Sequence, residues 1–231
     1  MKNKLSDKIN NDYSYIWMLI FWPAFGLLFS MEEKFIKLGS CHAVHCFLDD
    51  LIPFSEWFAV PYVLWFAYLI AAVFYTLFFD AGAFVKMMKF IMFTYLTSLF
   101  IYLIFPSCQM LRPQSFERDN FLTRFMAYYY SIDTNTNVCP SMHVLGSFAA
   151  FFAFTRGKTK HSAVFNASLA VFTALICIST VFVKQHSVLD ILTALPLCAL
   201  AYAFFFAKRD EECGAPKEIS VRTVSYTHLT L

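Results

Sequence analysis

The sequence predicts an all-α polytopic membrane protein built as a bundle of six transmembrane helices. Of its 231 residues, 59% are hydrophobic and only 15% are charged, and the mean hydropathy of +0.56 lies outside the usual range of soluble domains. Its long apolar runs suit helices of roughly 20 residues, the length needed to cross lipid. The net charge of +2 is too small to indicate a nucleic-acid partner.

Six apolar segments are the expected spans, and they form one membrane domain over residues 15–207. In chain order they are Tyr15–Ser30, Trp57–Phe79, Phe84–Phe105, His143–Thr155, Ala163–Val183 and Val188–Ala207. The first is short and contains Pro23, as the core of a signal peptide would. Its many aromatic residues, with no small-residue cleavage pattern behind them, favour a retained span.

An even number of spans places both ends of the chain on one side of the membrane. That side carries 12 of the 18 Lys and Arg residues, so the positive-inside rule makes it cytoplasmic. Residues 1–14 are then a cytoplasmic N-terminal segment and residues 208–231 a cytoplasmic tail. The last residues, 225–231, lose hydropathy and periodicity and resemble a non-native scar, so we leave them out of the fold.

Three polar clusters interrupt the apolar chain. They are Leu111–Pro113, Cys139–His143 and Lys184–Asp190. The first follows the third span, the second opens the fourth, and the third lies between the fifth and sixth, so all three reach the outer, extracytoplasmic face. Ionisable groups next to a bilayer are costly, and we therefore expect one functional site there.

The residue types in these clusters suit a phosphate group. Pro140 is typical of a first helical turn, which would place Ser141 where free backbone N–H groups and the helix dipole favour an anion. Arg112 is expected to bind two phosphate oxygens through its planar guanidinium, and Lys184 to add a compact positive charge. A snorkelling lysine at the end of the fifth span is the alternative for Lys184. This site requires no metal ion and no cofactor.

Two histidines and one aspartate supply the predicted chemistry. His186 and Asp190 are four residues apart, so on a helix that starts near Ser187 they share a face, and the carboxylate can orient the imidazole. His143, with an ordinary pKa near 6.5, suits a general acid and base. Each histidine taken alone is more often a satisfied surface residue, and only the combination indicates catalysis.

The clusters resemble the signature of the type 2 phosphatidic-acid phosphatase superfamily, K-x6-R-P, P-S-G-H and S-R-x5-H-x3-D. The matching residues are Arg112, Pro113, Pro140, Ser141, His143, Ser179, His186 and Asp190. The resemblance implies a lipid phosphatase that hydrolyses a phosphomonoester or pyrophosphate at the outer membrane face. It also implies that His186 is the nucleophile and becomes a phosphohistidine.

Three positions depart from this signature. Phe105 stands where the lysine is expected, Met142 replaces the glycine and Thr180 replaces the second arginine, while Lys184 is placed to restore one cation. An apolar residue at the glycine position is similar to the branch of inositol phosphorylceramide and sphingomyelin synthases. The alternatives are therefore a phospholipid head-group transferase, or a non-catalytic lipid-binding carrier on the same scaffold.

The outer loops carry two further features. The run Cys41–Cys46 holds two Cys and two His, but the spacing is too cramped for one zinc ion, so a structural role is expected, with Cys41 paired to Cys46, Cys108 or Cys139. The stretch Asp49–Glu56 is either a short roof over the site or a solvated helix start. The expected partners are the bilayer and a lipid phosphate, and the preferred location is a bacterial inner membrane.

Overall fold

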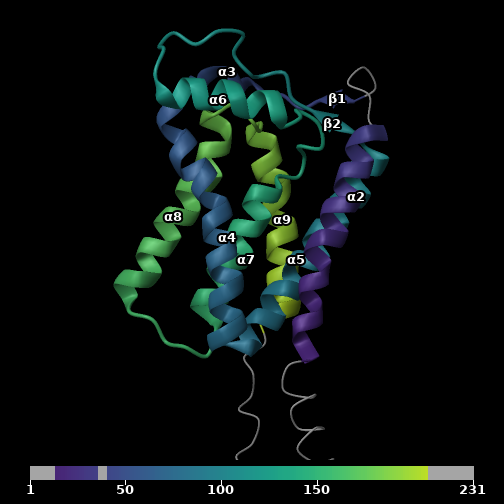
Figure 1. Ribbon diagram of the computed structural model, residues 1–231, viewed down its shortest axis with the longest axis vertical. Helices are drawn as coiled ribbons and strands as arrows, with labels where there is room; N and C mark the ends of the chain where they lie inside the picture. Colours follow the sequence, from purple (N-terminus) through teal and green to yellow (C-terminus); the bar gives the residue numbers. More distant parts are fainter. Residues whose placement is uncertain (1–13, 36–40, 208–231) are drawn as a thin grey trace, which may run out of the picture.

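The computed structural model describes residues 14–35 and 41–207, which fold mostly as helices arranged in an upright bundle (Figure 1). The predicted terminal segments, residues 1–14 and 208–231, lie outside the described residues apart from Ser14. The helices are η1 Ser14–Ile20, α2 Phe21–Phe35, α3 Phe47–Leu51, η3 Glu56–Phe58, α4 Ala59–Phe79, α5 Ala81–Ile104, α6 Phe121–Ile132, α7 Met142–Arg156, α8 Ala163–Phe182 and α9 Val188–Phe205. Two short strands, β1 His42–Ala43 and β2 Ser107–Cys108, pair in parallel.

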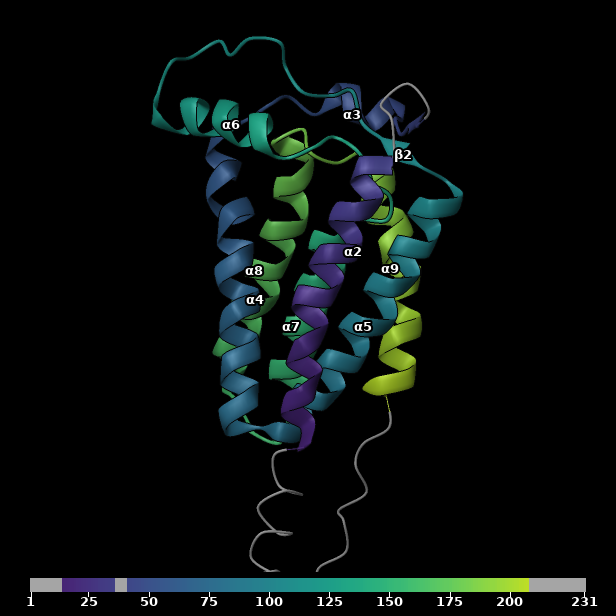
Figure 2. The same ribbon diagram turned by 45° about the vertical axis from the view of Figure 1, so that its right-hand side comes forward.

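Helix α7 occupies the centre of the bundle. It packs against α4, α5, α8 and α9, while α2 lies outside α5, as the two views of the ribbon show (Figures 1 and 2). The side of α7 that faces its neighbours is built from small or branched residues, which allows close approach of the surrounding helices. Its buried residues are Val144, Leu145, Gly146, Ser147, Ala149, Ala150 and Ala153.

Five of the six predicted spans are helices long and apolar enough to cross a membrane. They are Ser14–Phe35, Glu56–Phe79, Ala81–Ile104, Ala163–Phe182 and Val188–Phe205. The predicted span at His143–Thr155 is α7, which has 15 residues and is therefore about 22 Å long, shorter than a hydrocarbon core of about 30 Å. Six spans are thus not confirmed, because the fourth is a short helix enclosed by its neighbours.

Polar side chains and backbone ends set where the long helices begin. Asp80 caps α5, with Oδ1 2.9 Å from the Ala83 N–H, and its other oxygen accepts from the Lys158 N–H at 2.6 Å. One carboxylate therefore joins the α4–α5 junction to the loop after α7. Ser162 caps α8 and Ser187 caps α9, so the predicted start of the last helix near Ser187 is confirmed.

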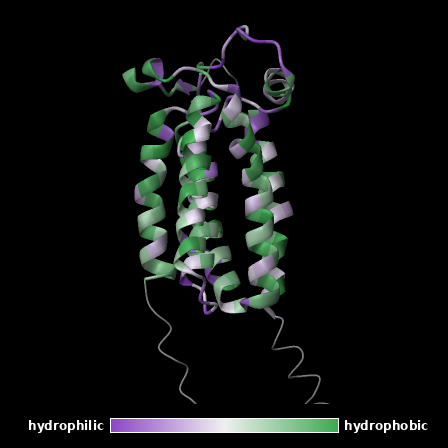
Figure 3. Cartoon of the chain, turned by 90° about the vertical axis from the view of Figure 1, so that its left-hand side faces the viewer, coloured by the Kyte–Doolittle hydropathy of each residue, from purple (hydrophilic) through white to green (hydrophobic). Residues whose placement is uncertain are grey.

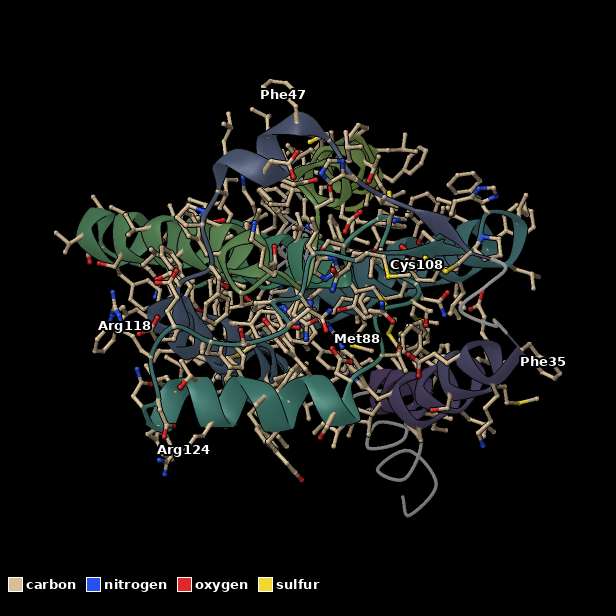
Figure 4. The ribbon with its side chains drawn as sticks, turned by 90° about the horizontal axis from the view of Figure 1, so that it is seen from above. Phe35, Phe47, Met88, Cys108, Arg118 and Arg124 are labelled. Atoms are coloured by element: carbon tan, nitrogen blue, oxygen red, sulfur yellow. A yellow bond between two sulfur atoms is a disulfide. The ribbon has the colours of Figure 1, made fainter. Side chains whose placement is uncertain are left out.

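One end of the bundle is covered by a cap layer, which comprises residues 41–58 and 106–141. Here α6 lies across the helix ends, and the disulfide Cys41–Cys108 joins two segments 67 residues apart. Figure 3 shows hydrophilic residues gathered in this layer and at the opposite loops, with hydrophobic helices between them. Seen from above, α6 and α3 lie along opposite edges of the layer, with Arg118 and Arg124 at one end and Phe35 at the other (Figure 4).

The three polar clusters all lie at the end of the bundle that the cap layer covers. The C-terminal end of α5, the start of α7 and the junction of α8 with α9 meet there, whereas Ser14 and Ala207 lie at the opposite end (Figure 1). The predicted meeting of the clusters on one face is therefore found in the structure. Within residues 14–35 and 41–207, no group of three His, Cys, Asp or Glu side chains is arranged to hold a metal ion.

Gly146 lets α7 approach Tyr95 and Trp65 closely, and this contact generates the first prediction. A Cβ atom there would lie 2.7 Å from the Tyr95 hydroxyl and 3.0 Å from Cζ2 of Trp65. We expect Gly146→Ala to lower the free energy of unfolding in detergent by about 1–3 kcal/mol, the usual cost of overpacking a core. Gly26→Ala, where no atom lies within 4 Å, is the matched control; equal stability of the two variants would contradict the prediction.

Candidate active site

The site is centred on a hydrogen-bonded pair formed by His186 and Asp190. His186 Nδ1 lies 3.0 Å from Asp190 Oδ2 and 3.1 Å from the Val138 carbonyl oxygen. The same carboxylate oxygen accepts from the Ser187 N–H at 3.0 Å, because α9 begins at Val188 and Asp190 occupies its first turn. A proton on Nδ1 would therefore be held by oxygen acceptors, leaving the Nε2 lone pair to face a substrate.

The loop before α9 presents His186 to the interior of the cap layer. The N–H groups of Gln185 and His186 both donate to the Thr180 carbonyl oxygen at 3.0 Å. Lys184 adopts a positive φ of 53°, the left-handed conformation that commonly ends a helix. Thr180, which replaces the arginine of the phosphatase signature, is buried and donates its hydroxyl to the Cys177 carbonyl oxygen. Its side chain is thus part of the helix end and does not face a ligand.

His143 is held beside His186 by aromatic rings from α4. The two imidazole centroids are 5.5 Å apart and nearly perpendicular, while Tyr62 stacks on His143 at 4.6 Å and Trp65 contacts it at 4.3 Å. The Nε2 atom of His143 is buried and has no hydrogen-bond partner among the described residues. The rings restrict the orientation of the imidazole and leave this nitrogen available for proton transfer.

The N-terminus of α7 lies next to His186 and Asp190. Ser141 is its N-cap residue, and the Ser141 N–H donates to the backbone oxygen of Asp190 at 3.1 Å. The prediction that Pro140 lies in the first helical turn is therefore wrong, because Pro140 precedes the N-cap residue. The N–H groups of residues 142–144 have no acceptor inside the helix, and the buried Ser141 hydroxyl has no partner among the described residues. This arrangement can accept an anion.

Arg112 does not present free donors to this site. Its Nε–H and one Nη2–H donate to Gln185 Oε1 at 3.0 and 2.5 Å. The remaining donors reach the carbonyl oxygens of Tyr130, Asp133 and Thr134 at 3.1, 2.9 and 2.8 Å. All five guanidinium N–H groups are thus occupied. Burial lowers the pKa of Arg112, and burial also raises the pKa of Asp133 to about 6 against the opposing effect of the arginine.

Lys184 is likewise held by backbone oxygens. Its Nζ donates to the carbonyl oxygens of Asp49 and Ile52, at 2.7 and 2.5 Å, and so fastens the end of α3 to the loop after α8. Burial lowers the pKa of this ammonium group, an effect that the neighbouring acidic residues oppose. The predicted phosphate contacts of Arg112 and Lys184 would require these bonds to be exchanged, whereas His186, His143, Asp190 and Ser141 are already together.

The sequence analysis placed Asp49 in a possible roof over the site but missed its contacts with the start of α9. Its carboxylate accepts from the Ser187 hydroxyl at 2.6 Å, the Val188 N–H at 2.8 Å and the Cys46 N–H at 2.8 Å. Burial opposes ionisation of this group, but these hydrogen bonds lower its pKa overall. No local pattern indicates this contact, since Asp49 and Ser187 are 138 residues apart. Helix α6 was also missed, although Asn120 and Thr123 form a capping box before it.

The described residues line two cavities, one in the helix bundle and one in the cap layer. A groove of about 280 Å³ between α7, α8 and α9 is lined mainly by apolar side chains, and one wall begins at Ile191, directly after Asp190. A more polar cavity of about 420 Å³ lies beside Arg112 and is lined by Glu33 and residues 130–136.

Comparison of the chain with models of known protein families, with curated proteins and with solved structures finds no match. The resemblance to the phosphatase superfamily therefore rests on the motif residues and their spacing.

The bonding of Arg112 yields a prediction about the segment it holds. Arg112→Lys keeps the charge but has three donors in place of five, so we expect faster hydrogen–deuterium exchange in peptides covering residues 130–136. Arg124→Lys changes an exposed arginine on α6 that pairs only with Asp119 among the described residues, and it serves as the control. Unchanged exchange over 130–136 would contradict the bonding described above.

Proposed function

We propose that this chain is an integral-membrane enzyme that cleaves a phosphate ester or anhydride bond of a lipid through a phosphohistidine at His186. The observation that carries the proposal is the geometry of three side chains. His186 Nδ1 is 3.0 Å from the buried carboxylate of Asp190, and the His143 ring lies 5.5 Å from the His186 ring at the N-terminus of α7. A nucleophile, its orienting group and an acid–base group are therefore adjacent.

The proposed reaction has two steps. In the first, His186 Nε2 attacks phosphorus, an N–P bond forms, and the P–O bond to the leaving group breaks as protonated His143 gives its proton to the departing oxygen. In the second, neutral His143 takes a proton from water while the water oxygen attacks phosphorus and the N–P bond breaks. Asp190 stabilises the imidazolium form of His186, and the N–H groups at the start of α7 stabilise the phosphoryl oxygens.

Three observations support a lipid substrate and an extracytoplasmic site. Five helices are long and apolar enough to cross a membrane, and Ile191, the residue after Asp190, lines the apolar groove between α7, α8 and α9. The Cys41–Cys108 disulfide lies in the cap layer, and disulfides persist mainly in oxidising compartments. In this proposal α7 completes the six-helix membrane domain, enclosed by longer helices that compensate for its length.

The nucleophile assignment is tested with purified full-length protein in detergent. Release of phosphate or of the lipid alcohol is measured from phosphatidate, a prenyl pyrophosphate and phosphatidylglycerol. We expect His186→Ala to lower kcat/KM by at least about a thousandfold, because the covalent step is lost. His45→Ala, a cap-layer histidine paired with Asp50, should retain activity. Equal activity of His186→Ala and wild type would refute the assignment, and inactivity of wild type on every donor would favour a lipid carrier.

The groove provides a separate test of the lipid position. Ala174 lines it, and Ala174→Phe should fill part of its volume of about 280 Å³. We expect KM to rise for a substrate with long acyl chains and to stay nearly constant for a dihexanoyl substrate. Ala71→Phe, on the exposed side of α4, is the matched control. Equal KM values for the long-chain substrate in the two variants would argue against acyl-chain binding in the groove.

A further inference from the structure

Two carboxamide side chains in the cap layer are buried and hold polar atoms that have no hydrogen-bond partner among the described residues. Gln109 is 0% exposed and Asn137 is 4% exposed. The Gln109 Nε2 atom and both polar side-chain atoms of Asn137 have no partner among the described residues. A buried amide without a hydrogen bond destabilises a protein, because the loss of its contacts with water is not compensated. These groups are therefore candidates for contact with a ligand.

The two amides lie on two hydrogen-bonded segments of the cap layer, and one of these segments contacts His186. Gln109 and Asn135 are joined by two hydrogen bonds, from the Gln109 N–H to the Asn135 carbonyl at 3.0 Å and from Asn135 Nδ2 to the Gln109 carbonyl at 2.7 Å. Asn137 directly precedes Val138, whose carbonyl oxygen lies 3.1 Å from His186 Nδ1. Asn137 is thus carried by the same backbone that contacts His186, and Gln109 lies on the segment bonded to it.

Other buried groups of the site also lack partners. Among the described residues, the Ser141 hydroxyl, His143 Nε2 and Asp190 Oδ1 make no hydrogen bond. They lie at the start of α7 and the start of α9, which the Ser141 N–H joins to the Asp190 carbonyl oxygen. Three further unsatisfied donors and acceptors therefore lie at the predicted reaction centre.

The charges in this region do not favour a doubly charged ligand. Arg112 has every donor occupied and lies 3.8 Å from Asp133, and Lys184 is bonded to backbone oxygens beside Asp49. With Asp190 included, the two cations face three carboxylates, a net charge of −1 with both histidines neutral and 0 once His143 carries the proton that it gives to the leaving group. Bringing a dianion into such a partly buried site is costly, because neither Arg112 nor Lys184 has a free donor to pair with it.

We propose that Gln109 and Asn137 donate hydrogen bonds to the phosphoryl oxygens of the substrate, and that this substrate is a singly charged phosphodiester lipid rather than a doubly charged phosphomonoester. Neutral amides can bind the single negative charge without requiring another cation. This inference rests on the proposed function and narrows its substrate class.

The chemistry of the two steps is unchanged for a diester. His186 Nε2 forms the N–P bond, one of the two ester P–O bonds breaks, and the departing alkoxide receives the His143 proton. The other ester oxygen stays on phosphorus, so the intermediate is a singly esterified phosphohistidine. Water, or an alcohol, then attacks phosphorus and gives its proton to His143 as the N–P bond breaks.

The test compares phosphatidylglycerol with phosphatidate of identical acyl chains, using full-length protein in detergent. We expect kcat/KM to be at least about tenfold higher for phosphatidylglycerol. Asn137→Gly suits the positive φ of 57° and removes the amide, and Gln109→Glu keeps the acceptor bonded to the Leu111 N–H. Each variant should lose about 10- to 100-fold in kcat/KM on phosphatidylglycerol, the effect of one hydrogen bond to a charged group.

Asn166→Ala removes an amide from the first turn of α8, at the far end of the bundle, and is the matched control. Thermal unfolding of each variant establishes that it is folded. Faster His186-dependent cleavage of phosphatidate than of phosphatidylglycerol, or full activity of both amide variants, would overturn the inference while leaving the proposed function intact.

A binding measurement tests the inference even if the protein cleaves neither lipid. Absence of cleavage would refute only the proposed function. Dihexanoyl phosphatidylglycerol should raise the unfolding temperature of wild type and of His186→Ala more than dihexanoyl phosphatidate does. The shift should be lost in Asn137→Gly and kept in Asn166→Ala. Equal shifts of the unfolding temperature in Asn137→Gly and Asn166→Ala would overturn the amide site. A larger shift of wild type with phosphatidate than with phosphatidylglycerol would also overturn it.

Discussion

Asp190 has no exposure to solvent, so its carboxylate depends on hydrogen bonds from the protein. One oxygen lies within hydrogen-bond distance of His186 Nδ1 and the Ser187 N–H, and the residue's backbone oxygen accepts from the Ser141 N–H. A single residue thus joins the start of α9, the loop after α8 and the start of α7. The candidate nucleophile and the candidate anion site are held together by this one group.

The same junction is supported from the cap layer by Asp49, whose carboxylate binds the hydroxyl of Ser187 and the N–H of Val188. The first turn of α9 therefore interacts with two carboxylates, one from its own sequence and one from α3. Negative charge at a helix N-terminus is favourable, which compensates in part for burying both groups. The cost of this arrangement is a local excess of negative charge beside the site.

Arg112 and Lys184, the two cations that could balance this excess, instead bind backbone carbonyl oxygens of the cap layer. Arg112 satisfies carbonyl oxygens at and after the end of α6, and Lys184 satisfies those at and after the end of α3. Irregular backbone at the end of an apolar bundle needs such donors, because carbonyl oxygens without partners are costly near lipid. The other groups of the candidate site are neutral or negative unless a histidine is protonated, and this arrangement limits the negative charge that the proposed substrate can carry.

The sequence alone determined the features that depend on local spacing. Apolar periodicity located the long helices, the interval of four residues paired His186 with Asp190, and the order of spans brought the three clusters to one end of the bundle. The length of α7, the use of Arg112 and Lys184 and the pairing of Cys41 with Cys108 were decided only by the tertiary structure. The physical reason is that periodicity and capping act within one or two helical turns, whereas the partner of a long polar side chain depends on which distant backbone lies beside it. Asp49 and Ser187, 138 residues apart and 2.6 Å from oxygen to oxygen, illustrate that dependence.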